Sequence, residues 1–137
     1  MSQAIDHLIA AQQQAMSIRP NVGGFPYLAE ALRQAGITKN YWYLPSLQSI
    51  YHTPYGNVVQ QGTPLVQGMA DIAAFNKEAL MTAITTDQAG KSTFPEFLTA
   101  IWHAGVVSYE VDFVLRSVTY FGATNEQYKE TYPDVQI

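Results

Sequence analysis

Two stretches of this sequence are versions of one motif: FPYLAEALRQAGI at residues 25–37 and FPEFLTAIWHAGV at residues 94–106. Phe, Pro, two Ala and Gly recur at a spacing of 69 residues (94 − 25 = 69), and from Tyr41 and Tyr109 onward the spacing is taken as 68. In both stretches a helical apolar period runs up to a glycine, which ends helices in a left-handed conformation. We therefore predict an internal repeat over about residues 3–62 and 71–132.

Each repeat unit has the pattern of two helices followed by a hairpin and a third strand. Helices are predicted for about 15 residues after Ser2, then from Phe25 to Ala35, from about Asp71 to Gln88, and from Thr93 to Ala104. Aromatic and β-branched residues broken by turn residues follow each second helix, which is typical of antiparallel strands. Because neither unit buries its apolar face alone, we expect a single pseudo-symmetric α+β domain over residues 1–137. One continuous sheet and two packed sheets both stay open.

Composition limits the class of function. The chain of 137 residues is 47% apolar and has no cysteine, which excludes a disulfide framework and thiolate chemistry. Its net charge is −4 and its seven Lys and Arg residues are scattered, so it lacks the basic patch that nucleic acids or anionic membranes attract. No apolar run approaches the roughly 18–20 residues of a membrane span, and the N-terminus lacks the basic start of a secretory signal. We expect a cytoplasmic protein that binds neither nucleic acid nor membrane.

The second half of the sequence resembles a known family. The residues concerned are GKSTFPEF at 90–97, Ala104-Gly105-Val106, Tyr109, Val111-Asp112 and Thr119-Tyr120-Phe121. They are similar to the uncharacterised YbcV-like family, domain of unknown function 1398, over about residues 25–133. Members are often labelled phage envelope proteins. The resemblance implies a small α+β protein and brings no activity, cofactor or catalytic residue with it.

Motifs for metal binding and catalysis are sparse. His7, His52 and His103 have no paired spacing and there is no Cys, so we predict neither a metal site nor a cofactor. No G-x-S-x-G elbow occurs, and GKS at 90–92 lacks the first glycine of a phosphate loop. Glu110 and Asp112 lie two apart on a predicted strand, so they share one face and form a candidate acid/base pair. The alternative is that they form the solvated face of an antiparallel strand.

A candidate binding face of the first hairpin can be inferred by comparison with the second hairpin. With a two-residue loop at Leu115-Arg116, the core face holds Tyr109, Val111, Phe113, Val118 and Tyr120, and the outer face holds the two acids. Shifting the outer face by 68 residues brings Trp42, Leu44, Ser49 and Tyr51 to the same face of the first hairpin, and its candidate binding residues are Trp42, Leu44 and Tyr51, with His52 and Tyr55 nearby. Aromatic side chains of this kind anchor recognition surfaces. The alternative is that the first helix or the segment after Gly62 covers this face as core.

Two functions compete on these grounds. The first is a non-catalytic binding or interaction module that uses the aromatic face of the first hairpin to hold a protein partner, a second copy of itself in a homodimer, or a small ligand that the sequence does not identify. The alternative is a small enzyme that uses Glu110 or Asp112, with His52 or a Tyr, in a cleft between the two repeats. A structural role in a virion rests on the family label alone.

Overall fold

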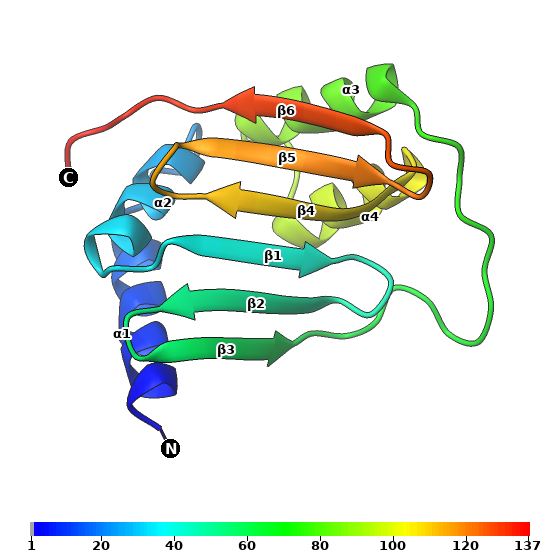
Figure 1. Ribbon diagram of the computed structural model, residues 1–137. Coiled ribbons are helices and arrows are strands. Elements are labelled where there is room, and N and C mark those ends of the chain that lie inside the picture. The colour runs from blue at the N-terminus through cyan, green and yellow to red at the C-terminus, as the bar shows by residue number, and fades with distance from the viewer. Residues whose placement is uncertain (1) are drawn as a thin grey trace.

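The computed structural model describes residues 2–137, which form four helices and one six-stranded antiparallel sheet (Figure 1). The helices are α1 (Gln3–Ile18), α2 (Phe25–Gln34), α3 (Lys77–Gln88) and α4 (Phe94–His103). The strands are β1 (Lys39–Tyr43), β2 (Gln48–Thr53), β3 (Gly56–Gln61), β4 (Val106–Asp112), β5 (Ser117–Gly122) and β6 (Gln127–Thr131). The predicted α+β class is confirmed, as is a third strand after each hairpin.

The helix ends follow from local sequence. The Thr93 hydroxyl accepts a hydrogen bond from Glu96 N while the Glu96 carboxylate accepts one from Thr93 N, so the predicted capping box of α4 is confirmed. The prediction that α3 begins near Asp71 is wrong by about two turns: Asn76 caps it by accepting a hydrogen bond from Ala79 N, and residues 71–76 are irregular. No helix within residues 2–137 is long and apolar enough to cross a membrane.

The strands form one continuous sheet in the order β3-β2-β1-β4-β5-β6, which answers the question that the sequence left open. β1 and β4 pair antiparallel at its centre and so join the two halves of the chain. All the helices lie on one face of the sheet (Figure 1). We call this the helix side, and the other the open face. The order of elements is the same in both halves, while the internal sequence repeat stays a prediction.

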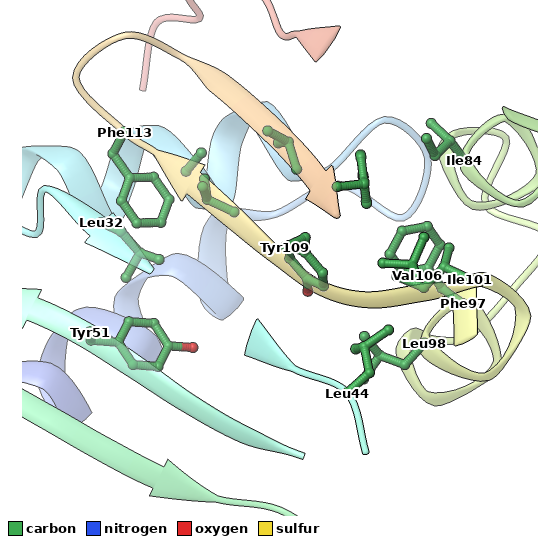
Figure 2. Close-up of a cluster of buried hydrophobic side chains, with 14 of the residues drawn as sticks. Leu32, Leu44, Tyr51, Ile84, Phe97, Leu98, Ile101, Val106, Tyr109 and Phe113 are labelled. Atoms are coloured by element: carbon green, nitrogen blue, oxygen red, sulfur yellow. The ribbon is translucent and has the colours of Figure 1, made fainter. Parts of the chain in front are cut away.

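The core lies between the sheet and the helices. The predicted core face of the second hairpin is confirmed, since its members are all buried: Tyr109, Val111, Phe113, Val118 and Tyr120. Helix residues such as Leu32, Leu98 and Ile101 cover them in one apolar cluster (Figure 2). Burying a large apolar side chain contributes roughly 1.5–3 kcal/mol, so this layer is what holds the helices on the sheet.

The register of the second hairpin differs from the prediction. Val111 pairs with Val118 and the turn covers residues 113–116, because Asp112 Oδ1 accepts hydrogen bonds from Val114 N and Leu115 N and holds the wider turn closed. The turn between β1 and β2 covers residues 44–47 in the same way. Its last residue, Leu47, has φ 53°, and Arg116 at the end of the second turn has φ 54°. Matched positions in the two hairpins are therefore 69 residues apart (116 − 47 = 69), not 68.

Candidate functional site

The predicted aromatic face does not exist as one exposed surface. Leu44 and Tyr51 are 0% and 7% exposed and lie in the core cluster under the helices, so their predicted exposure is wrong (Figure 2). The reason is the one-residue error in spacing, because a slip of one residue moves every side chain of a strand to the other face. Trp42 alternates with Tyr41 and lies on the helix side too, where it is half-buried.

The structure separates the other two predicted residues from this group. His52 lies on the open face beside Tyr41, with 5.4 Å between ring centroids. Tyr55 is exposed in the turn between β2 and β3, where its ring meets the edge of His7 of α1 at 5.2 Å. Of the five predicted residues, Trp42 is the one that lines a pocket described below.

Glu110 and Asp112 occupy the open face, on the opposite side of the sheet from the helices. Glu110 Oε1 forms an ion pair with Lys39 Nζ at 3.2 Å, and this contact raises the pKa of the Lys39 ammonium. Asp112 holds the turn of its hairpin. Residues 2–137 contain no group of three or more His, Cys, Asp or Glu placed to hold a metal ion. Both acids thus have a structural task that accounts for their position.

A pocket of about 480 Å³ opens on the helix side of the first hairpin. A row of three side chains crosses its floor, because Trp42 pairs with Ser49 in the β1–β2 register and Ser49 pairs with Gln60 in the β2–β3 register. The remaining lining residues come from the turn, the segment after β3 and the start of α4: Leu47, residues 61–65, Phe94, Pro95, Leu98 and Thr99. We call this the Trp42 pocket. Its volume is in the range typical of small-molecule sites.

Trp42 is held in one orientation. Its indole Nε1 donates a hydrogen bond to Asn40 Oδ1 at 2.6 Å, and Asn40 Nδ2 donates to Ile50 O at 3.1 Å. The ring packs edge-on against Phe94 of α4 at 5.3 Å and stacks on Tyr109 at 6.2 Å between centroids. Such aromatic contacts contribute about 0.5–1.5 kcal/mol beyond the area they bury. The indole is therefore fixed before any ligand arrives.

Ser49 is a residue of the Trp42 pocket that the sequence analysis did not single out. Its side chain is 0% exposed, and its Oγ has no hydrogen-bond partner among residues 2–137. Leaving a buried hydroxyl unpaired typically costs about 1–3 kcal/mol, so such a group calls for a reason. The Tyr51 hydroxyl lies beside Ser49: burial raises the pKa of the Tyr51 phenol, and hydrogen bonding to the side chains of Gln12 and Ser49 offsets part of that rise. The available signal was its alternation with Tyr51 along the strand, which places both side chains on one face.

The Trp42 pocket is electrically neutral. Within the described chain, no residue that lines it carries an ionisable side chain. The N-terminus of α4 offers little to an anion, because its capping box uses Glu96 N and Pro95 has no N–H. A hydroxyl without a neighbouring base or acid is not activated as a nucleophile. The arrangement is suited to holding a molecule by apolar contact and hydrogen bonding, rather than to proton transfer.

Fold and pocket together define a small α+β protein with a neutral, ligand-sized site. The chain belongs to the family described as protein of unknown function (DUF1398), whose model matches residues 13–130. It is 50% identical over 136 residues to the uncharacterised protein Rv2012 of Mycobacterium tuberculosis and, equally, to Mb2035 of Mycobacterium bovis; the match covers 99% of this chain and 83% of each relative. The predicted membership of domain of unknown function 1398 is confirmed, while the YbcV-like name stays a prediction. The phage label, a homodimer and a protein partner stay predictions.

Proposed function

We propose that this protein is a non-catalytic binding module and that its ligand occupies the Trp42 pocket, on the aromatic helix-side face of the first hairpin. The observation that carries the proposal is a pocket of about 480 Å³ whose lining, in the part of the chain that the structure describes, combines aromatic and aliphatic side chains with no ionisable group. Apolar walls with a few placed polar atoms are the usual composition of a small-molecule site. The occupant is a small molecule and not a polypeptide strand, because α4 and residues 61–65 close the pocket on two sides.

The alternative, an enzyme that uses Glu110 or Asp112, has less support. Both acids lie across the sheet from the Trp42 pocket, so neither can reach a molecule bound there. Acid/base catalysis needs the titrating group within hydrogen-bond reach of the reacting atom. A bound molecule in this pocket would meet threonine hydroxyls, amides and rings, which recognise it without transferring protons.

Trp42 can report on its own pocket. The chain has two Trp residues, so Trp102→Phe leaves Trp42 as the single fluorophore of its kind. We expect at least one of three probes (toluene, phenol and benzamide) to change Trp42 emission saturably and to raise the thermal unfolding midpoint. Binding to the native state stabilises it in proportion to the logarithm of ligand concentration over Kd.

A matched pair of variants places the binding site. Thr99 lines the pocket from an exposed position on α4, so Thr99→Phe puts a ring at its mouth. Thr82→Phe makes the same change at an exposed position of α3, outside the pocket. We expect Thr99→Phe to abolish the response and Thr82→Phe to keep it. The proposal is wrong if no probe changes Trp42 emission or the thermal unfolding midpoint of the protein without the Phe changes. It is also wrong if Thr99→Phe and Thr82→Phe respond equally, because the probe would then bind outside the Trp42 pocket.

A further inference from the structure

The two edges of the sheet differ in how they are protected. β3 forms one edge and β6 the other (Figure 1). An edge strand presents unpaired backbone N–H and C=O groups to any strand that approaches, and proteins usually protect such edges with charges, proline or a bulge. β6 carries Lys129 and Glu130, and Pro133 follows it. The sequence of β3, GNVVQQ, has no charge and no proline, its pairing with β2 has no register shift, and every residue except Val58 is exposed.

The hydrogen-bond register determines which backbone groups of β3 point outward. Gly62 N donates to Leu47 O at 2.8 Å, and this bond continues the β2–β3 pairing by one residue. Hydrogen-bonded residues alternate along an antiparallel strand. The N–H and C=O groups of Asn57, Val59 and Gln61 therefore point away from the sheet, and Val59 is the middle residue of this outward set.

The other edge shows that the fold does not require an apolar residue at this position. Val59 pairs with Ile50, and Lys129 of β6 pairs with Thr119, which lies 69 residues after Ile50 (119 − 50 = 69). Lys129 is thus the counterpart of Val59. A lysine at the middle of an edge strand repels a second copy of that strand, because two-fold pairing would bring like charges together. Val59 is 62% exposed and presents no such barrier.

We infer that β3 pairs antiparallel with β3 of a second copy of this chain, about a two-fold axis at Val59, so that the two sheets join into one in a homodimer. Val59 then lies opposite Val59 of the partner subunit, and Asn57 lies opposite Gln61 of the partner subunit. An apolar contact with an amide pair on each side is complementary to itself, as a two-fold interface requires. Because the chain has a net charge of −4, an uncharged strand is where two copies meet with the least repulsion.

Sedimentation velocity over a concentration series tests the dimer, with one substitution made at two exposed valines. Val59→Lys gives β3 the residue type that β6 has at the matched position. Val114→Lys is the control in the β4–β5 turn, where Val114 is 57% exposed. We expect the wild type to dimerise with a Kd below about 0.1 mM, and Val59→Lys to raise this Kd at least about tenfold. Val114→Lys should leave the Kd unchanged, as should Thr99→Phe, which acts on the Trp42 pocket.

Cross-linking tests the position of the two-fold axis. The chain has no cysteine, so Val59→Cys introduces a single thiol. Directly opposed residues of a hydrogen-bonded antiparallel pair have Cα atoms about 5.5 Å apart, which lies within the roughly 4.4–6.8 Å that a disulfide spans. Under mild oxidation we expect Val59→Cys to form a covalent dimer at least about tenfold faster than the matched variant Val114→Cys.

The outcomes separate this inference from the proposed function. The inference is wrong if the wild type stays a monomer up to about 1 mM. It is also wrong if Val59→Cys cross-links no faster than Val114→Cys, because any dimer contact would then lie away from Val59. If Val59→Lys does not fold, the wild-type series and the two cross-linking rates decide the question. A dimer that Val59→Lys weakens and Val59→Cys captures supports the inference, whether or not a probe binds in the Trp42 pocket.

Discussion

The turns of the two hairpins, β1–β2 and β4–β5, have the same backbone arrangement, but different side chains lie between each turn and its helix. At the end of the second hairpin, Arg116 lies between Glu30 of α2 and Asp134 of the C-terminal segment, at 3.6 and 3.2 Å. Beside it Tyr132 packs edge-on against Phe25 at 5.1 Å. At the end of the first hairpin the matched space is the Trp42 pocket. One backbone arrangement therefore supports both a filled cluster and a hollow.

Residue size and charge explain the difference. Leu47 stands where the second hairpin has Arg116, and Thr99 stands on α4 where α2 has Glu30, again 69 residues apart (99 − 30 = 69). Figure 1 shows α2 behind the end of the sheet where β4 turns into β5 and α4 behind the opposite end. Each helix thus covers one turn. The β4–β5 turn is held to α2 by the ion pair between Arg116 and Glu30, whereas the β1–β2 turn leaves a pocket between itself and α4. The pocket therefore results from the side chains at this end of the sheet and not from the backbone fold.

The largest effect on stability is expected from a feature that the two turns share, namely that the first residue of each turn is buried. Leu44 and Phe113 are both buried in the core cluster. Truncation leaves a cavity, so we expect Leu44→Ala to lower the free energy of unfolding by about 2–5 kcal/mol and Phe113→Ala by about 3–5 kcal/mol, measured by urea denaturation. Leu115→Ala, in the same turn but 68% exposed, is the control and should stay within about 0.5 kcal/mol. A loss below about 1 kcal/mol for Leu44→Ala would place it on the surface, as the sequence pattern had indicated.

Elements could be predicted from this sequence because their signals are local. Caps such as Thr93 with Glu96, and the glycines that end α2 and α4, act within one helical turn. The faces of the second hairpin were predicted correctly even though Asp112 closes a wider turn than the assumed Leu115-Arg116 loop, because a shift of two residues in pairing keeps each side chain on its face. The faces of the first hairpin were predicted wrongly, because they were taken from the second with a spacing one residue too short. The pocket was missed for a different reason: its lining comes from the β1–β2 turn, residues 61–65 and α4, which only the folded chain brings together.

A smaller effect on stability is expected from the charged residues near the β4–β5 turn. Hydrogen bonds from Arg33, with Gln34 and the charge of Arg116, hold the pKa of Glu30 at about 2 against an ordinary value of 4.5, although burial opposes this. Because the folded pKa is the lower one, the resulting stability is complete above pH 4.5 and is lost as pH falls toward 2. The arginine partners are 38% and 28% exposed, so we discount the full shift and expect about 1–2 kcal/mol.

Glu30→Gln tests this effect in acid-dependent urea unfolding. The variant should be less stable than the wild type by about 1–2 kcal/mol at neutral pH, and the gap should close as the pH falls from 4.5 toward 2. Glu78→Gln, at an exposed position of α3, is the matched control and should leave the acid dependence of the wild type unchanged. A gap that stays constant with pH would mean that Glu30 acts through packing rather than through its charge.

The smallest effect is expected at the hollow end. Ser49 Oγ makes no hydrogen bond of full geometry within residues 2–137 and has the Tyr51 hydroxyl beside it, so Ser49→Ala should change the free energy of unfolding by no more than about 0.5 kcal/mol. Ser92→Ala is the matched comparison, because its hydroxyl donates to Asp87 Oδ1 at 3.2 Å and its loss should cost about 0.5–1.5 kcal/mol. Both are measured by urea denaturation of the ligand-free protein. Equal losses at the two serines would mean that Ser49 is hydrogen-bonded inside the protein as firmly as Ser92, and the two hairpin ends would then differ in packing alone.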